Sequence, residues 1–215
     1  MVVLKEFISV FLMFFKKTIA LAITGASGAG YALTLLEQLL QAECRVYLMV
    51  TQAGQIVLNM ETDHHFSAQP KILQEELIQY YQAQAGQLFV FGRQQWLAPV
   101  ASGTNPPDAM VVCPCTTGAL SAISVGASNN LMERAADVML KERKKLILVV
   151  RETPLSEIHL ENMLKLSRMG VVIMPASPGF YENPTQLQDL IDFMVARILD
   201  HLAVPQQLIK PWGKV

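Results

Sequence analysis

Five short aliphatic runs recur along the chain, and helix-forming stretches separate them. The runs cover residues 18–24, 46–50, 110–113, 145–150 and 171–174. Strands buried on both faces are continuously aliphatic, and their alternation with helices is typical of a parallel sheet covered on both sides. With 215 residues, 52% of them hydrophobic, the chain suits one such α/β domain with a large core. We therefore predict a doubly wound parallel sheet in three αβα layers.

Helices are predicted between and after these runs from the spacing of apolar residues. One follows Gly30 with Leu33, Leu36, Leu39 and Leu40 on one face, and the others cover residues 71–84, 131–141, 158–169 and 185–201. No internal repeat or linker interrupts the pattern, which favours a single domain.

The first 17 residues contain an apolar run that is shorter than the ~20 residues a bilayer span needs. We expect residues 1–17 to be an extension outside the fold, and residues 18–215 to be one domain with a short C-terminal arm. A net charge of −1 gives no pull toward nucleic acid or an anionic membrane. Three cysteines, an odd and small number, fit a reducing cytoplasm, and the spacing of Cys113 and Cys115 is not that of a zinc site.

Ligands of a parallel sheet bind outside the carboxyl ends of its strands. Five strand-to-helix junctions form the expected binding edge: Gly25–Gly30, Thr51, Pro114–Gly118, Arg151–Pro154 and Pro175–Tyr181. The proline that opens the third junction is expected to end the third strand. The first junction departs from the dinucleotide pattern G-x-G-x-x-G, and no acidic residue ends the second run, which counts against NAD.

Several side chains at this edge have a structural interpretation beside a functional one. The turn GASGAG serves either tight packing or an anion at a helix N-terminus. Thr116 and Thr117 either cap the next helix or bind a phosphate or ring carbonyl. Arg151 and Glu152 follow a buried run directly. An exposed ion pair contributes only about 0–1 kcal/mol, so a bound ligand explains their placement better.

Cations and aromatic residues farther along the chain leave the same choice open. Arg134 and Lys141 lie about two helical turns apart on one face, where surface ion pairs are usual. Tyr181 is either packed or a donor to a ligand. Arg197, in an apolar helix, either extends to solvent or pairs with an anion.

Taken together, several segments in matching order closely resemble the UbiX/Pad-type flavin prenyltransferases. They read TGASGAGY, CPCTTGALSAIS, ERAADVMLKER, RETPLSEIHLENM, PGFYENP and VARIL. Flavin-dependent cysteine decarboxylases share the Gly-rich turn, but they carry a Pro-x-Met-Asn stretch and a catalytic His. Here PASPGFY stands in place of the former, and no His occurs in residues 124–130.

The resemblance implies a Rossmann-like or flavodoxin-like homo-oligomer, expected to be a dodecamer, with FMN sites between subunits. It implies metal-independent transfer of a dimethylallyl group from dimethylallyl monophosphate to N5 and C6 of reduced FMN. The product, prenylated FMN, serves UbiD-type decarboxylases in ubiquinone synthesis or aromatic acid decarboxylation. A cysteine decarboxylase and a non-catalytic flavin carrier remain as alternatives.

Matched motifs also imply the site residues. Those expected to contact FMN are Gly25, Ala26, Ser27, Thr51, Thr116, Thr117, Gly118, Ala119 and Arg151. Those expected to bind the prenyl phosphate are Lys141 (from a neighbouring subunit), Arg151, Tyr181 and Arg197. Those expected to act in catalysis are Ser27, Glu61, Trp96, Arg134, Lys141 and Glu152. No Asp-x-x-Asp pair lies in a loop to hold Mg²⁺ on a diphosphate, which favours a monophosphate donor and no metal.

Overall fold

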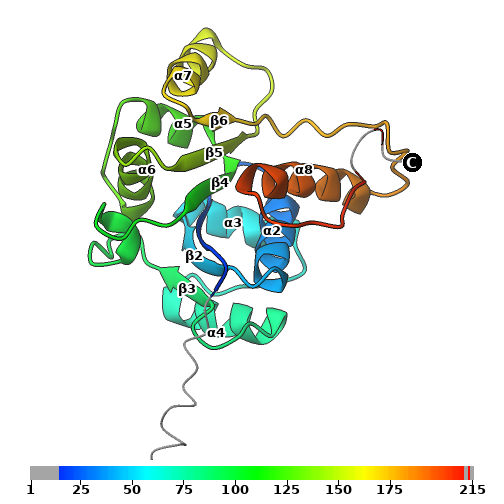
Figure 1. Ribbon diagram of the computed structural model, residues 1–215, viewed down its shortest axis with the longest axis horizontal. Coiled ribbons are helices and arrows are strands. Elements are labelled where there is room, and N and C mark those ends of the chain that lie inside the picture. The colour runs from blue at the N-terminus through cyan, green and yellow to red at the C-terminus, as the bar shows by residue number, and fades with distance from the viewer. Residues whose placement is uncertain (1–14, 211–212, 214–215) are drawn as a thin grey trace, which may run out of the picture.

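The computed structural model describes residues 15–210 and Gly213, and its centre is a six-stranded parallel sheet (Figure 1). Its strands are β1 (Thr18–Ile23), β2 (Arg45–Val50), β3 (Leu88–Phe91), β4 (Ala109–Cys115), β5 (Lys145–Val150) and β6 (Val172–Ile173). Their spatial order is β3-β2-β1-β4-β5-β6, the doubly wound Rossmann order, which reverses between β1 and β4. The predicted parallel αβα architecture is confirmed.

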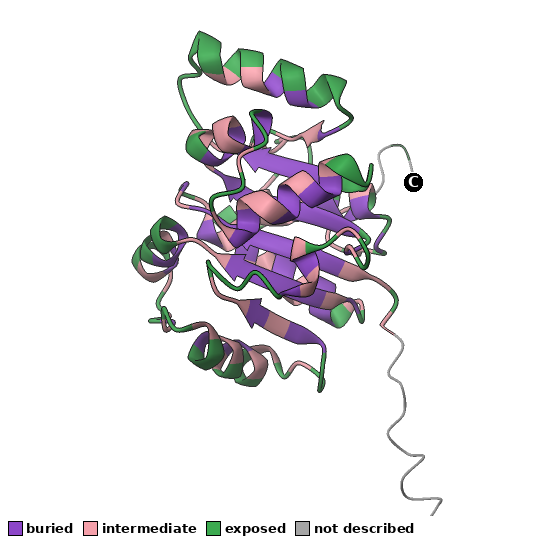
Figure 2. Cartoon of the chain, turned by 90° about the vertical axis from the view of Figure 1, so that its left-hand side faces the viewer, coloured by how far each residue is buried: buried purple, intermediate pink, exposed green. Residues whose placement is uncertain are grey.

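Helices cover both faces of the sheet (Figures 1 and 2). One face carries α2 (Ala29–Gln41), α3 (Gln52–Glu61), α4 (Pro70–Tyr81) and α8 (Leu187–Leu202). The other carries α5 (Thr117–Ser124), α6 (Leu131–Lys141) and α7 (Glu157–Arg168). A 3₁₀ turn, η1 (Pro99–Ala101), lies on the way from β3 to β4.

The alternation of side chains along β1 shows how the sheet separates two cores. Ile19, Leu21 and Ile23 pack into the core beneath α2 and α8. Ala20 and Ala22 point the opposite way, into the core beneath α5 and α6. All five are buried, as expected for a central strand whose successive side chains alternate between faces.

Elements β3, α3 and α5 lie outside the strands and helices predicted from apolar spacing, and the first two have only weak patterns. Strand β3 has only four residues, at the sheet edge. Helix α3 buries Gly54, Gln55 and Leu58, so only one member of its buried face is a large apolar residue. Apolar periodicity therefore carries little signal in either element.

The prediction that Pro114 ends the third strand is wrong, since β4 continues to Cys115. Proline has no N–H to donate to a ladder. The pairing of β4 with β5 shifts register between Val112 and Cys115, so no regular ladder bond is required of Pro114.

The chain contacts the fold slightly before β1. Lys16 pairs with Glu43 at 2.8 Å, and the Lys17 ammonium donates to the carbonyls of Leu202 and Ala203. The predicted extension, residues 1–17, thus contributes its last residues to the domain, and residues 1–14 lie outside the described part.

Candidate active site at the carboxyl edge of the sheet

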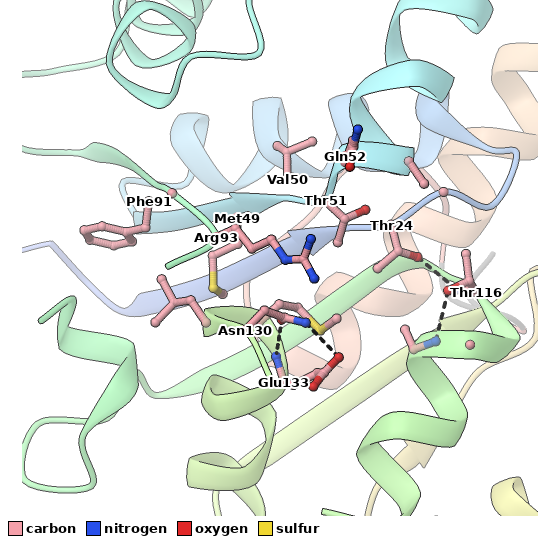
Figure 3. A pocket seen from close by; sticks show the side chains of 17 residues that line it. Thr24, Met49, Val50, Thr51, Gln52, Phe91, Arg93, Thr116, Asn130 and Glu133 are labelled. Atoms are coloured by element: carbon pink, nitrogen blue, oxygen red, sulfur yellow. Dashed lines mark hydrogen bonds between the residues drawn. The ribbon is translucent and has the colours of Figure 1, made fainter. Parts of the chain in front are cut away.

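A cavity of ≈ 350 Å³ opens at the carboxyl ends of β1, β2, β3 and β4 (Figure 3). It lies where the strand order reverses between β1 and β4, the position at which doubly wound sheets bind ligands. Of the residues expected to contact FMN, those lining it are Gly25, Thr51, Thr116, Gly118 and Ala119. Those that do not line it are Ala26, Ser27, Thr117 and Arg151.

Two helices begin at this cavity with threonine caps. Thr51 accepts the Gly54 N–H at 3.0 Å at the start of α3, and Thr116 accepts the Ala119 N–H at 3.1 Å at the start of α5. Capping by Thr116, one of the two interpretations left open, is therefore confirmed. Each helix N-terminus still directs a positive dipole end and further N–H groups toward the cavity, which suits a phosphate group.

Buried Thr24 connects the carboxyl ends of β1 and β4 beside the cavity. Its hydroxyl donates to the Pro114 carbonyl at 2.7 Å and accepts the Thr116 N–H at 2.9 Å. The relative positions of β1 and of the α5 N-terminus are thus set by one side chain, which is 2% exposed.

The remaining walls are largely apolar and fit the ring system of a flavin. Met49, Phe91, Leu131 and Met132 line the cavity. A Cβ atom at Gly118 would have no neighbour nearer than 3.9 Å, so the backbone there leaves room for a ligand to approach. Anion-binding helix ends beside apolar walls are the combination that FMN requires.

The chain's own Glu61 occupies the end of the Gly-rich turn that opens α2. The Glu61 carboxylate accepts the N–H groups of Gly28 and Ala29, both at 2.8 Å. Partial burial opposes its charge, but the Ser27 hydroxyl, the two amides and the Arg151 guanidinium outweigh burial and hold the pKa of Glu61 below its ordinary value. Glu61 therefore caps the part of the turn that opens α2, whereas Gly25 still lines the cavity.

Two glycines of this turn are required by geometry. Gly28 has φ = +122°, a conformation that residues with side chains rarely adopt. A Cβ atom at Gly25 would lie 2.4 Å from the Cβ of Ala53 at the start of α3. The turn and the start of α3 therefore lie too close together for a side chain at position 25.

Arg151 and Glu152 do not form the ion pair that was the structural alternative. Arg151 Nε donates to the Ser27 carbonyl at 3.2 Å and so joins the end of β5 to the Gly-rich turn. The Glu152 carboxylate accepts the Thr153 N–H at 3.1 Å. No ion pair within residues 15–210 involves either side chain.

The two α6 cations lie in local contacts. Arg134 pairs with Asp137 at 2.7 Å and donates through Nε to the Ala101 carbonyl at 3.0 Å. Lys141 pairs with Glu142. Within one chain, Arg134 and Lys141 thus form ion pairs with nearby acidic residues, as is usual on the exposed face of a helix.

The remaining predicted residues come from other parts of the surface. Arg197 on α8 pairs with Asp200 at 2.9 Å. The ring of Tyr181 meets Phe193 edge-on at 5.5 Å, and half of Tyr181 remains exposed. Trp96 is 44% exposed on the loop after β3. Because α6 and α8 cover opposite faces of the sheet, one chain does not gather the predicted phosphate-binding cations into a cluster (Figure 1).

Sequence reasoning missed several cavity residues, above all Arg93, Asn130 and Glu133. Arg93 follows the unpredicted β3, and the carboxyl-end rule would have selected it had that strand been recognised. Asn130 caps α6 by accepting the Glu133 N–H at 3.0 Å, and its amide donates to the Glu133 carboxylate at 2.7 Å. An Asn-x-x-Glu capping pattern was visible in the sequence.

Neither a metal site nor a membrane span is found in the described part of the chain. Residues 15–210 contain no group of three or more His, Cys, Asp or Glu side chains that could hold a metal ion. None of the described helices is long and apolar enough to cross a membrane.

Comparison with known proteins identifies the class to which this fold and cavity belong. A family model described as Flavoprotein matches residues 13–199. The chain is therefore a flavoprotein of the Rossmann-like αβα type.

Closer relatives narrow the class. The flavin prenyltransferase UbiX of Pseudomonas aeruginosa is 56% identical over 91% of this chain and 94% of its own length. The enzyme of the same name from Methanocaldococcus jannaschii is 41% identical over 92% of this chain and 99% of its own. This chain belongs to the UbiX flavin prenyltransferase family, as the sequence motifs indicated.

Solved structures agree with this assignment. AnUbiX (PadA1), in complex with FMN and dimethylallyl pyrophosphate, is 38% identical, with a TM-score of 0.82 over 93% of this chain and 98% of its own. A dodecameric FMN-dependent UbiX-like decarboxylase from Escherichia coli O157:H7 is 35% identical, with a TM-score of 0.81 over 92% of this chain and 100% of its own. A PPC decarboxylase mutant, at 16% identity and a TM-score of 0.54, shares the fold alone.

Proposed function

We propose that this chain transfers a dimethylallyl group from dimethylallyl monophosphate to reduced FMN, yielding prenylated FMN. The observation that best supports this function is the cavity at the point where the strand order reverses between β1 and β4. Two capped helix N-termini lie beside its apolar walls, and the chain belongs to the UbiX family. FMN, when bound and reduced, supplies the nucleophilic atoms N5 and C6.

The chain's own residues divide the work of binding. The amides at the starts of α3 and α5, beside Thr51 and Thr116, hold the FMN phosphate. Met49, Phe91 and Met132 enclose the ring system and exclude water. Arg151, held at the end of β5 by the Ser27 carbonyl, would bind the prenyl phosphate. Glu61 fixes the turn on which Ser27 stands.

Departure of the phosphate is the step that the cations assist. Arg151, Lys141, Arg197 and the Tyr181 hydroxyl stabilise the negative charge that develops on the leaving oxygen, and Arg134 adds to their field. Trp96 shelters the positive charge of the allylic group, since aromatic faces attract cations. Glu152 would act as the base for the proton displaced from C6.

These groups meet only in an oligomer. Arg134 and Lys141 lie on one face of the sheet, and Arg197 lies on the other, so a second copy must complete the cluster. We propose a homo-oligomer, a dodecamer like the Escherichia coli relative, with Lys141 reaching from a neighbouring subunit.

The donor is proposed to be the monophosphate, although the AnUbiX relative binds dimethylallyl pyrophosphate. Cations and hydroxyls can neutralise one phosphate without a metal. Full turnover in excess EDTA and a lower kcat/KM for the diphosphate are expected. A Mg²⁺ requirement or a preference for the diphosphate would contradict this choice.

We propose that the product passes to a UbiD-type decarboxylase in the cytoplasm, as in ubiquinone synthesis or aromatic acid decarboxylation. Free, buried Cys44, Cys113 and Cys115 suit a reducing compartment. Product released by this protein should activate an apo decarboxylase of that type, whereas FMN alone should not.

The decisive experiment measures the mass of the flavin after incubation of the protein with reduced FMN and dimethylallyl monophosphate. A gain of one prenyl unit is expected. Unchanged flavin that stays bound would instead support a carrier, and decarboxylation of a cysteinyl peptide would support the cysteine decarboxylase alternative.

A further inference from the structure

Arg93 is the one cation among the residues that line the flavin cavity. It stands two residues after β3, at the carboxyl edge of the sheet. Figure 3 shows its guanidinium pointing into the cavity, on the side where Thr51 and Asn130 also lie.

The position of Arg93 is fixed through its backbone. The Arg93 carbonyl accepts the Leu131 N–H at 2.9 Å, which ties the loop after β3 to the first residue of α6. The Gln94 amide reaches the Asn129 carbonyl at 3.5 Å beside it. The backbone of Arg93 is therefore held in place at the edge of the cavity.

The side chain of Arg93, in contrast, has no bonding partner in the described part of the chain. Across residues 15–210, the guanidinium of Arg93 makes no hydrogen bond or ion pair, unlike those of Arg134 and Arg197. The other charged residue of the cavity is Glu133, whose two carboxylate oxygens accept the Asn130 amide and the Asn129 N–H. Glu133 is thus engaged in capping α6 and does not neutralise Arg93.

We propose that Arg93 binds the phosphate of FMN, opposite the N-termini of α3 and α5. This inference rests on the proposed function. A phosphate monoester carries close to two negative charges at neutral pH, and helix dipoles alone balance only part of that charge. A free guanidinium offers paired N–H donors that match phosphate oxygens. The cations expected at the prenyl phosphate do not line this cavity, so Arg93 serves the flavin end.

The experiment compares FMN with riboflavin, which has the same ring and ribityl chain but no phosphate. Dissociation constants are measured by fluorescence quenching for the wild type, Arg93→Gln and Arg93→Lys. Arg93→Gln should weaken FMN binding about tenfold to a hundredfold and leave riboflavin binding unchanged. Arg93→Lys should recover part of the loss, because it restores the charge but not the planar fork. Added salt should weaken FMN binding more in the wild type than in Arg93→Gln.

The matched control is Arg168→Gln, an arginine without an ion pair in the described part, at the end of α7 and outside the cavity lining. It should bind both flavins as the wild type does. Equal losses for FMN and riboflavin, or no loss for either, would overturn the inference. Unchanged FMN affinity with a raised KM for dimethylallyl monophosphate would place Arg93 at the other phosphate and also overturn it. A wild type that binds neither flavin would instead refute the proposed function itself.

Discussion

The flavin cavity and the predicted cation cluster differ in how much of each a single chain builds. The cavity uses residues at the ends of neighbouring parallel strands, which one sheet edge necessarily brings together. The cations, apart from Arg151 at the end of β5, lie on α6 and α8, on opposite faces. The fold therefore assembles the residues at the strand ends, whereas the proposed cluster of cations on helix faces would need another subunit.

The largest effect is expected from a change that destroys the cavity. Gly28→Val should abolish flavin binding, because a β-branched residue at φ = +122° would displace the Gly-rich turn. The yellow colour of the purified protein and its FMN absorbance measure this. Gly86→Val is the control, since Gly86 also has positive φ but has open space around it. It should lower stability and retain the flavin.

Charge reversal in the cluster should separate catalysis from flavin binding. Arg197→Glu should lower kcat/KM about 10²–10³-fold, since electrostatic stabilisation of the leaving group is a large term. Flavin affinity should be unchanged, because Arg197 does not line the cavity. Trp96→Ala should lower kcat/KM less than Arg197→Glu does. A loss of FMN from Arg197→Glu would show that the two regions are not separate.

Subunit mixing tests whether the cluster is shared between copies. Lys141→Gln and Arg197→Gln should each be inactive alone. Co-assembled in equal amounts, they should recover about a quarter of wild-type activity, because half of all subunits keep each residue and a site needs both. The two variants mixed without subunit exchange are the control. No recovery on co-assembly would mean that both residues act from one subunit.

A smaller effect is expected at the Gly-rich turn, which Glu61 caps and which Arg151 joins to the end of β5. The pKa of Glu61 is lowered in the folded state, so its contribution to stability is present above its ordinary pKa and is lost as pH falls through the folded value. The wild type should therefore melt higher than Glu61→Gln near neutral pH, and the difference should vanish in acid. Thermal unfolding at several pH values measures this, and a difference independent of pH would count against the charged cap.

The smallest effect is expected outside both regions. Deleting residues 1–12 should leave FMN binding and activity unchanged, since the family match begins at residue 13 and β1 at Thr18. Loss of flavin from the shortened protein would make the extension part of the fold.

Much of the architecture could be read from the sequence because strong patterns mark it. The aliphatic runs at 46–50 and 145–150 became β2 and β5, and the helix expected over 131–141 matches α6. The short edge strand β3 and the weakly apolar α3 could not be read in the same way. Missing β3 also meant missing Arg93.

What the sequence determined by itself was the parallel sheet and the set of junctions at its ligand-binding edge, because both follow from the order of apolar runs. Tertiary structure decided how those junctions are used. Glu61 lies 33 residues after Gly28, and only packing of α3 beside α2 places its carboxylate on that turn. Likewise, right-handed crossovers on either side of the reversal place α2 and α6 on opposite faces, and α8 returns after the last strand, β6, to pack beside α2, a placement that no local pattern contains.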